Sequence, residues 1–417
     1  MTRKMGPFIG RRAVLGGAAG ALTMPFVARA QANPIKIGIQ SIFSGPIALL
    51  GSSSKGGIQI EINRINATGG LLGRQIQPIY RDSKGQPQEA ARVARELINT
   101  DGCEILLDAE ASSASFAVQE VVRDLGVLCV HSNSETASLT ADPKLRVSTC
   151  FRSARQSIHD AIVAGAHAAK VSKANKLTKW ATNSPDYSFG RDVTAQFLQF
   201  LKHFNPDIEI ASQAWPKMGQ PDFTEVITKI LQAKPQALFT TLFAGDLSAF
   251  VNQGNVYALF SAMQVFSSGM GDLPVLTAVK SLPVGIQCAA RYLPNFPDVA
   301  GNRTFYDTYR QANNNEYPTN WSWESATGMR FVEAAVKKAG TTDGKAAADA
   351  MRGMSIESPF STTGKVTMRA EDNTMVDYAI GWGTSVPQAP FVTGIEPGDW
   401  GQIRELEAEW KKTSGYG

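Results

Sequence analysis

Small hydroxyl and glycine residues follow three of the apolar runs in the first half of the chain. The loops are Ser41–Gly51 (SIFSGPIALLG), Ala109–Ser115 (AEASSAS) and Ser132–Thr140 (SNSETASLT). Free backbone N–H groups at helix starts, together with serine and threonine hydroxyls, suit a carboxylate or another anion without a fixed cation. N-capping by serine explains any one loop equally well. Three such loops on neighbouring strands favour an anion-binding site at one edge of a sheet.

Motifs of common enzyme classes are absent from the sequence: there is no GxSxG elbow, no HExxH, no P-loop and no GxGxxG after the first expected strand. His131 ends an expected central strand, a position that could face a cleft. Four cysteines are widely spaced, with no CxxC pattern for metal or redox chemistry: Cys103, Cys129, Cys150 and Cys288. The sequence therefore predicts no catalytic residue, no metal and no cofactor. One disulfide remains open, without an indication of its pairing.

The first 30 residues have the pattern of an export signal. Arg11-Arg12 precede a mild, Gly/Ala-rich apolar run and a small-x-small site that ends at Ala30. This pattern predicts a signal peptide over residues 1–30, of the twin-arginine type, and a periplasmic protein cleaved near Ala30. The signal contains five basic residues and no acid, so its removal takes the formal charge from +4 to −1. The mature chain is therefore not basic, and its charge gives no reason to expect a nucleic-acid partner.

The stretch Gly56–Asp82 (GGIQIEINRINATGGLLGRQIQPIYRD) predicts one crossover of a parallel sheet. Three isoleucines at i, i+4 and i+7 form the apolar face of its helix: Ile58, Ile62 and Ile65. Gly69-Gly70 ends the helix, because glycine adopts left-handed backbone angles without a Cβ clash. A strand up to Asp82 follows, and the strand Ile35–Gln40 precedes the loop and helix. The unit therefore reads strand–loop–helix–strand.

Strands and amphipathic helices alternate through residues 33–150 and again through 151–271. Such alternation predicts an α/β fold with mostly parallel sheets covered by helices on both faces. The remaining residues are too few for a third such unit, so we expect them to complete both. Helices Trp321–Lys338 and Lys345–Arg352 would return to the first unit. Strands near Gly364–Met368 and Asp377–Gly381 would return to the second, and Gly394–Gly417 would be a surface tail with a short charged helix.

At this point the order of the segments resembles a known family. SGPIALLG, the Gly56–Asp82 stretch, AEASSASFA, HSNSETASLT and NSPDYSFGRD follow one another as in leucine/isoleucine/valine-binding periplasmic proteins of ABC importers. The resemblance implies the type I periplasmic binding protein fold, with two Rossmann-like lobes, a three-crossover hinge and closure on a small ligand. It implies this division: 33–150 plus 272–355 as lobe 1, 151–271 plus 356–395 as lobe 2, and 396–417 as a C-terminal tail.

The resemblance also carries the family's binding positions onto this chain. The serine loop that binds a carboxylate falls on Ser112 and Ser113, and the second small-residue loop falls on Ser134, Glu135 and Thr136. Two aromatic positions of the second lobe fall on Tyr187 and near Phe243, and a first-lobe tyrosine is replaced by leucine around Leu50. The acid that pairs with the ammonium of an amino acid is absent, because Gly269 or Met270 stands at its place.

We therefore expect a small organic carboxylate or amide, aromatic or amino-acid-like, held by Ser113, Thr136 and backbone N–H groups between Tyr187 and Phe243. Glu110, Glu135, Asp186 and Asp246 are the acids that could replace the missing one. The expected partners are this ligand and, transiently, an inner-membrane permease, with the protein itself a monomer. Two alternatives stay open: a two-lobed sensor module that reports a solute to a membrane receptor, and an exported hydrolase.

Overall fold

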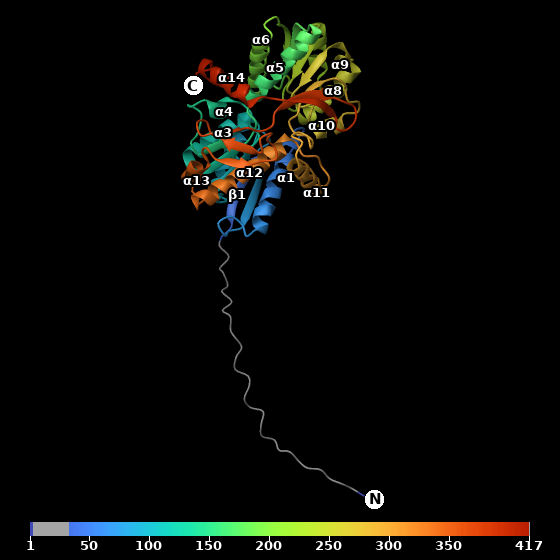
Figure 1. Cartoon of the computed structure of the whole chain (residues 1–417). Coiled ribbons are helices and arrows are strands. Elements are labelled where there is room, and N and C mark those ends of the chain that lie inside the picture. Colours follow the sequence, from blue (N-terminus) through green and yellow to red (C-terminus); the bar gives the residue numbers. More distant parts are fainter. Residues whose placement is uncertain (3–32, 417) are drawn as a thin grey trace. The chain divides into compact units, whose positions relative to one another are not determined.

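Strand and helix alternate from the first described strand onward, as the hydrophobic pattern predicts. The computed structural model describes residues 1–2 and 33–416 (Figure 1). The predicted signal peptide lies outside these residues. No helix in the described part of the chain is both long and apolar enough to cross a membrane.

The first sheet is entirely parallel, in the order β2-β1-β3-β4-β5. Its strands are β1 (Ile35–Ser41), β2 (Ile76–Asp82), β3 (Ile105–Ala109), β4 (Leu128–His131) and β5 (Cys150–Arg152). The helices around it are α1 (Leu49–Ala67), α2 (Pro87–Asn99), α3 (Ser112–Leu125), α4 (Ser138–Ala141), α12 (Asn320–Ala339) and α13 (Gly344–Met351). Alternate strand residues face two apolar clusters: Ile105 and Leu107 pack with α1 and α12, whereas Leu106 packs with α2 and α3. Both faces of the sheet are therefore buried, as parallel sheets require.

The second sheet has the order β15-β14-β10-β9-β8-β6-β7. Five strands run parallel: β6 (Lys179–Asn183), β7 (Glu209–Ala214), β8 (Ala237–Thr240), β9 (Gln264–Ser267) and β10 (Gln287–Ala289). Two antiparallel strands close one edge: β14 (Gly381–Ser385) and β15 (Val392–Pro397). The helices of this half are α5 (Ser157–Asn175), α6 (Ser188–Phe204), α7 (Thr224–Gln232), α8 (Ala244–Val256), α9 (Leu259–Ala262) and α10 (Leu273–Ala278). Phe197 of α6 stacks on Phe239 of β8 with ring centroids 3.7 Å apart, and both side chains belong to the core.

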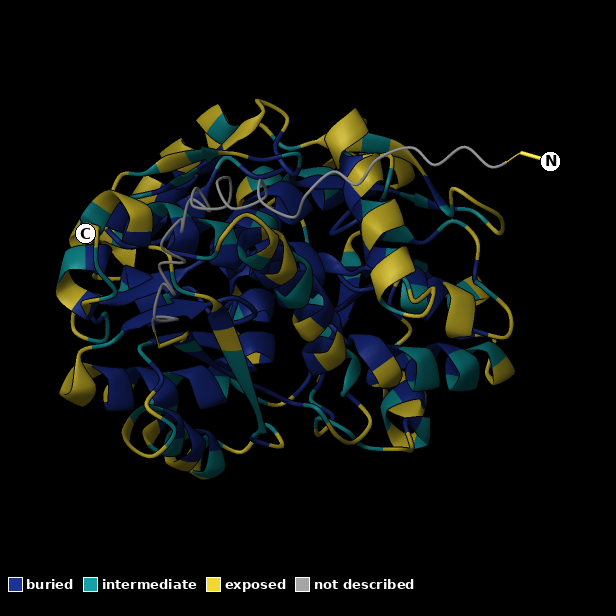
Figure 2. Ribbon diagram, turned by 90° about the horizontal axis from the view of Figure 1, so that it is seen from below, coloured by how far each residue is buried: buried dark blue, intermediate teal, exposed yellow. Residues whose placement is uncertain are grey.

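The crossover predicted at Gly56–Asp82 is confirmed as β1–α1–β2. All three isoleucines of its helix face are buried, at 1% exposure or less. Gly69 and Gly70 have φ of 100° and 82°, in the region that favours glycine. This crossover brings Leu50, in the first turn of α1, to the carboxyl edge of the sheet. Figure 2 shows that the strands are buried in the interior and that the exposed residues lie on the outer faces of the helices.

Three expectations about the last third of the chain are wrong in detail. The strand Lys365–Met368 (β12) does not join the second sheet; it pairs antiparallel with β11 (Ser355–Glu357) and β13 (Met375–Val376) in a separate sheet. β10 belongs to the second sheet, although the division above placed residues 272–355 in lobe 1. Short alternating strands fit parallel and antiparallel neighbours equally well, so their pattern does not choose the sheet.

The C-terminal segment is also more than a surface tail. β15 forms an edge strand, and α14 (Trp400–Thr413) packs against α5, where His159 lies 3.1 Å from Glu407. The side chains of Ile403 and Trp410 in α14 are buried. Arg369 adds bidentate hydrogen bonds to the buried Glu407 of α14. A remaining helix, α11 (Ala300–Ala312), packs against α1.

Candidate ligand-binding site

A cavity lies where the carboxyl ends of the strands of both sheets meet. The first sheet's half contributes Leu50, Ala111, Ser112, Asn133 and Glu135 together with Trp321 of α12. The second sheet's half contributes Tyr187, Phe189, Phe243, Gly269, Asp272 and Arg291. The cavity between these side chains has a volume of about 20 Å³, room for about one water molecule. The site is therefore narrow and closed around a small volume.

Most residues predicted for the site line this one cavity: Leu50, Ser112, Glu135, Tyr187, Phe243 and Gly269. Ser113, Ser134 and Thr136 do not belong to its lining. The Ser113 hydroxyl instead lies 3.1 Å from the Ser188 hydroxyl, which links the starts of α3 and α6. Ser134 Oγ donates to the Glu110 carbonyl over 3.2 Å. The predicted role of Ser113 and Thr136 as ligand-holding hydroxyls therefore has no direct support in the geometry.

The start of α3 presents unused donors to the cavity. Ala111 is the N-cap of this 14-residue helix and lines the cavity with Ser112, the first helical residue. No group in the described part of the chain accepts a hydrogen bond from the backbone N–H of Ser112 or Ser113. The Ser112 hydroxyl accepts from the Thr136 backbone N–H over 3.3 Å, which ties the two predicted loops together. The positive end of a helix with free N–H groups suits an anion.

Four aromatic rings line the cavity in a row. Tyr187 lies 5.8 Å from Phe189, Phe189 lies 6.2 Å from Phe243, and Phe243 lies 5.8 Å from Trp321, measured between ring centroids. The last two pairs meet edge to face, an arrangement that aromatic rings favour. Tyr187 and Phe243 are the N-cap residues of α6 and α8, so the helix starts fix their positions. Trp321 of α12 completes this wall.

Arg291 and Glu135 form a buried ion pair inside the cavity, between the loop after β10 and the loop after β4. The Arg291 backbone carbonyl accepts a hydrogen bond of 3.1 Å from the Trp323 indole, which fixes this loop against α12. Arg291 Nε has no hydrogen-bond partner within the described chain. Burial raises the pKa of Glu135 even though Arg291 stabilises its ionised form. For Arg291 burial opposes the charge, but the surrounding acids, Glu135 foremost, hold its pKa above the ordinary value.

Asp272 brings a second carboxyl into the cavity. It is the N-cap of α10, three residues beyond Gly269, and its Oδ1 finds no partner among the described residues. Burial raises the pKa of Asp272 to about 7, although Arg291 favours the charged form. Behind the wall, burial and the neighbouring Glu135 raise the pKa of Glu324 to about 8. The cavity thus contains more acid than base.

Gly269 supplies no acid, as the sequence shows, and the backbone around it explains why. A Cβ at Gly269 would lie 2.5 Å from the Leu242 carbonyl oxygen, so this position is closed to any side chain. The carboxyl enters from Asp272 instead. Of the four acids that the sequence suggested as substitutes, only Glu135 lines the cavity. Glu110 is buried outside the lining, Asp186 pairs with Arg191 on the surface, and Asp246 accepts from the Gly219 backbone N–H.

Several cavity residues escaped sequence reasoning. Arg291 and Asp272 lie in loops without a motif, and an aspartate before a helix indicates an N-cap as readily as a binding group. Asn133 lies two residues after the end of β4 and donates to the Ser54 hydroxyl and the Ala109 carbonyl, so its place after a strand was the available signal. His131 does not face the cavity. It is buried and hydrogen-bonds Asp108.

A cleft at the carboxyl ends of two helix-covered sheets defines a two-lobed binding protein. The sequence matches the model of the periplasmic binding protein family over residues 34–380, and the chain belongs to this family. Among curated relatives, the leucine-, isoleucine-, valine-, threonine-, and alanine-binding protein of Pseudomonas aeruginosa is 22% identical over 80% of this chain and 86% of its own length. Leu/Ile/Val-binding protein homolog 3 of Brucella melitensis is 24% identical over 80% and 87%.

Solved structures show the same fold. A solute binding protein of an ABC transporter from Rhodopseudomonas palustris, in complex with 3,4-dihydroxybenzoic acid, has a TM-score of 0.77 at 23% identity and covers 86% of this chain and 95% of its own. The branched-chain amino acid transporter substrate binding protein of Streptococcus pneumoniae, in complex with isoleucine, has a TM-score of 0.71 at 20% identity and covers 88% and 99%. The family is one of periplasmic binding proteins rather than enzymes, and it places this chain in the periplasm.

Proposed function

We propose that this chain is the substrate-binding component of an ABC importer and captures a small carboxylate-bearing solute between its two lobes. The observation that carries the proposal is the composition of the single cavity described above. Its lining combines an unused helix start and an arginine with a wall of aromatic rings. Such a site binds and orients a ligand, and its lining contains no serine or cysteine paired with a histidine for covalent catalysis.

The carboxylate would be bound by the backbone N–H groups of Ser112 and Ser113 together with Arg291. The helix start supplies N–H donors and the positive end of its dipole. Arg291 has an unpartnered Nε beside the hydrogen bond that it makes to Glu135, so one face of its guanidinium remains for a second carboxylate. Because these groups come from both halves of the protein, a bound carboxylate would hold the lobes closed.

The rest of the ligand would lie against Phe243 and its aromatic neighbours. A single substituted ring or a short aliphatic side chain would pack against this apolar wall. Its entry would require the lobes to move apart, because the cavity has a volume of only about 20 Å³ in this structure. The aromatic acid bound by the Rhodopseudomonas palustris protein supports a ring, and the isoleucine bound by the Streptococcus pneumoniae protein supports an aliphatic chain.

Asp272 supports an amino-acid-like ligand as the second candidate. Its Oδ1 is unpartnered and its carboxyl has a pKa of about 7, so an ammonium group nearby would stabilise the ionised form. The names of the curated relatives, which refer to leucine, isoleucine and valine, agree with this candidate. A plain aromatic acid would leave Asp272 protonated, whereas an amino acid would ionise it. The two candidates therefore differ in whether binding releases a proton.

The rest of the proposal concerns export of the chain, closure of its lobes and docking on a permease. A twin-arginine signal over residues 1–30 would export the chain. Two lobes, one around the first sheet and one around the second, would close around the ligand, and the closed monomer would dock on an inner-membrane permease. A free carrier is favoured over a sensor, because the curated relatives named above are binding proteins.

A calorimetric panel tests the proposal directly. Benzoate, 4-hydroxybenzoate, leucine, phenylalanine, benzamide and benzylamine vary the carboxylate, ring and ammonium one at a time. We expect at least one carboxylate to bind with micromolar affinity or better, about −8 kcal/mol, and benzylamine not to bind. Titrations in buffers of different ionisation enthalpy would reveal the proton released by an amino acid. Tight binding of benzylamine with no carboxylate bound would overturn the proposal.

A further inference from the structure

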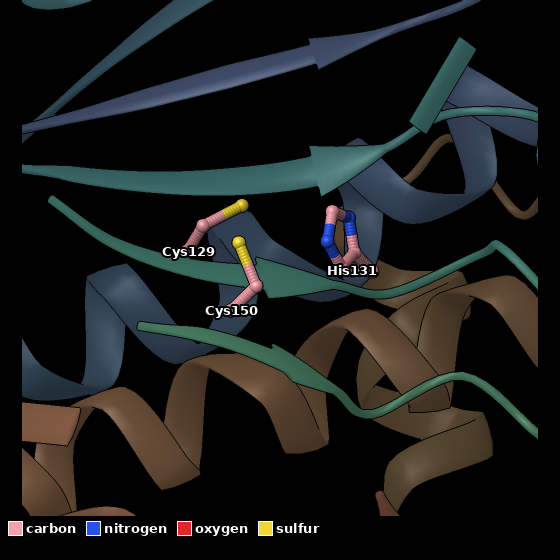
Figure 3. A group of neighbouring side chains, drawn as sticks. All are labelled: Cys129, His131 and Cys150. Carbon is pink, nitrogen blue, oxygen red and sulfur yellow. The ribbon is translucent and has the colours of Figure 1, made fainter. Parts of the chain in front are cut away.

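Three buried side chains meet in the first sheet, away from the ligand cavity. Cys129 of β4 lies directly opposite Cys150 of β5 in the parallel register, and His131 stands two residues further along β4 on the same face. All three are fully buried, with 0% exposure. Figure 3 shows the two sulfur atoms side by side, with the imidazole next to them on the same side of the strands.

The donor atoms of this cluster are close enough to share one ion. The two Sγ atoms and one imidazole nitrogen all lie within 4.8 Å of one another. Zinc binds thiolate sulfur at about 2.3 Å and imidazole nitrogen at about 2.0–2.1 Å, so donors around one tetrahedral ion lie roughly 3.5–4 Å apart. Small side-chain rotations would close the difference. Neither cysteine is part of a disulfide in the structure.

Neighbouring residues orient the imidazole as they do for a metal-binding histidine. His131 Nδ1 lies 2.5 Å from Asp108 Oδ2, and the Ser115 hydroxyl donates to the same oxygen over 2.5 Å. A carboxylate on Nδ1 keeps the proton there and leaves the lone pair of Nε2 free for a metal. Asp108 itself is completely buried. The arrangement is a carboxylate–histidine pair with two thiols beside the imidazole.

A further oxygen faces the same nitrogen. Gln119 Oε1 lies 3.3 Å from His131 Nε2, while Gln119 Nε2 donates to the carbonyls of Leu139 and Leu145 over 3.1 and 2.8 Å. These two bonds fix the amide, so its oxygen points toward the imidazole. Because the proton on His131 Nδ1 points to Asp108, His131 Nε2 and Gln119 Oε1 are both acceptors and face each other. This arrangement requires a cation between or beside them. Either a proton on Nε2 or a metal ion supplies it.

We propose that Cys129, His131 and Cys150 bind a thiophilic d¹⁰ metal ion, zinc(II) or copper(I), as a closed structural site. Two thiolates and an imidazole select such ions over the hard cations that prefer oxygen. Because the donors are sealed from solvent, the ion would stabilise the fold and would not act on a substrate. It would tie β4 to β5 directly below the Ser132–Thr140 loop, and Asn133 and Glu135 of that loop line the ligand cavity. The site departs from the expectation of no metal, and it stands whether or not the proposed ligand is right.

The test measures metal content and coordination in the full chain. Purified protein would be stripped with a chelator, reloaded with zinc(II) or copper(I), and analysed by plasma mass spectrometry. In parallel, cobalt(II) would be titrated as a spectroscopic substitute for zinc. We expect one ion per chain, thiolate-to-cobalt charge-transfer absorption in the near ultraviolet, and a higher Tm for the loaded protein.

Matched variants localise the ion. Cys150→Ser removes one donor, whereas the double variant Cys103→Ser/Cys288→Ser removes the other two buried cysteines and leaves the cluster intact. We expect the first to lose the ion and the second to keep it. If Cys150→Ser fails to fold, the cobalt spectrum of the unchanged chain still decides. Retention of the ion by Cys150→Ser would overturn the proposal. So would a chain that binds no metal and shows, after denaturation, either four free thiols or a Cys129–Cys150 disulfide.

Discussion

Replacing Arg291 by glutamine separates its contribution to ligand binding from its contribution to folding. Arg291 and Glu135 are almost completely buried, with side-chain exposures of 7% and 5%. Removing one partner of a buried pair costs about 3–5 kcal/mol, because the other charge is left without compensation. For the ligand, loss of a buried charge-assisted contact costs about 2–5 kcal/mol, or at least a 30-fold rise in Kd at 1.4 kcal/mol per decade.

The pH dependence identifies the cause of the lost stability. Burial already raises the pKa of Glu135, and without Arg291 it would rise further. A carboxyl whose folded pKa lies above its unfolded value imposes no penalty at low pH and destabilises the fold as pH rises toward the folded pKa. Arg291→Gln should therefore be near wild type in stability at pH 4 and several kcal/mol weaker at pH 8.

The double variant Arg291→Gln/Glu135→Gln provides the matched control. It keeps the size of both side chains and removes both charges, so its stability should not fall with pH as that of the single variant does. Urea unfolding at several pH values and calorimetry with the tightest carboxylate measure the two effects. If the double variant bound that carboxylate as tightly as the wild type, Arg291 would not contact the ligand and the reasoning would be refuted.

Three other predictions test the site and the fold. Asp272, with a folded pKa of about 7, costs up to about 4 kcal/mol relative to an unfolded pKa near 3.9. Asp272→Asn should therefore stabilise the protein at pH 8 but not at pH 4, and should weaken the binding of ammonium-bearing ligands only. The control Asp298→Asn changes an exposed aspartate and should leave the urea midpoint unchanged. An equally unchanged midpoint for Asp272→Asn at pH 8 would contradict the prediction. Phe243→Ala should lower the free energy of unfolding by about 3–5 kcal/mol and weaken the binding of aromatic ligands at least tenfold, whereas Phe243→Leu should lose less than half as much. If calorimetry gave equal affinities for the wild type and both variants, Phe243 would not form part of the ligand-binding wall. Gly70→Ala should destabilise the protein by more than the roughly 1–3 kcal/mol of backbone strain alone, because its Cβ would lie 2.1 Å from the Arg74 carbonyl oxygen. Gly69→Ala is the control, since a Cβ there would meet open space. Equal Tm values for the two variants would contradict the turn geometry.

The sequence predicted the elements best where a local pattern determines them. The isoleucine face of α1, the glycine turn after it and the parallel pairing of β1 with β2 all follow from spacing and backbone preference within Gly56–Asp82. Tyr187 and Phe243 came instead from the family resemblance, and both lie in the cavity lining as N-cap residues of helices.

What the sequence could not predict depends on contacts between distant segments. Arg291 reaches the cavity only because β10 joins β9, and its pairing with Glu135 spans 156 positions. The meeting of Cys129 with Cys150 depends on the register of β4 and β5, which no spacing motif encodes. For Ser113 the loop was predicted correctly but the direction of the side chain was not. Neighbouring residues at a helix start point in different directions, and the Ser113 hydroxyl points toward Ser188.

The central claim is that a carboxylate is held between the start of α3 and Arg291, with its apolar part against Phe243. A crystal structure with the tightest-binding carboxylate of the panel tests this most directly. We predict carboxylate oxygens within hydrogen-bond distance of the Ser112 and Ser113 backbone N–H groups and of the Arg291 guanidinium. A ligand bound outside this cavity, or one whose carboxylate points toward the aromatic wall, would contradict the account.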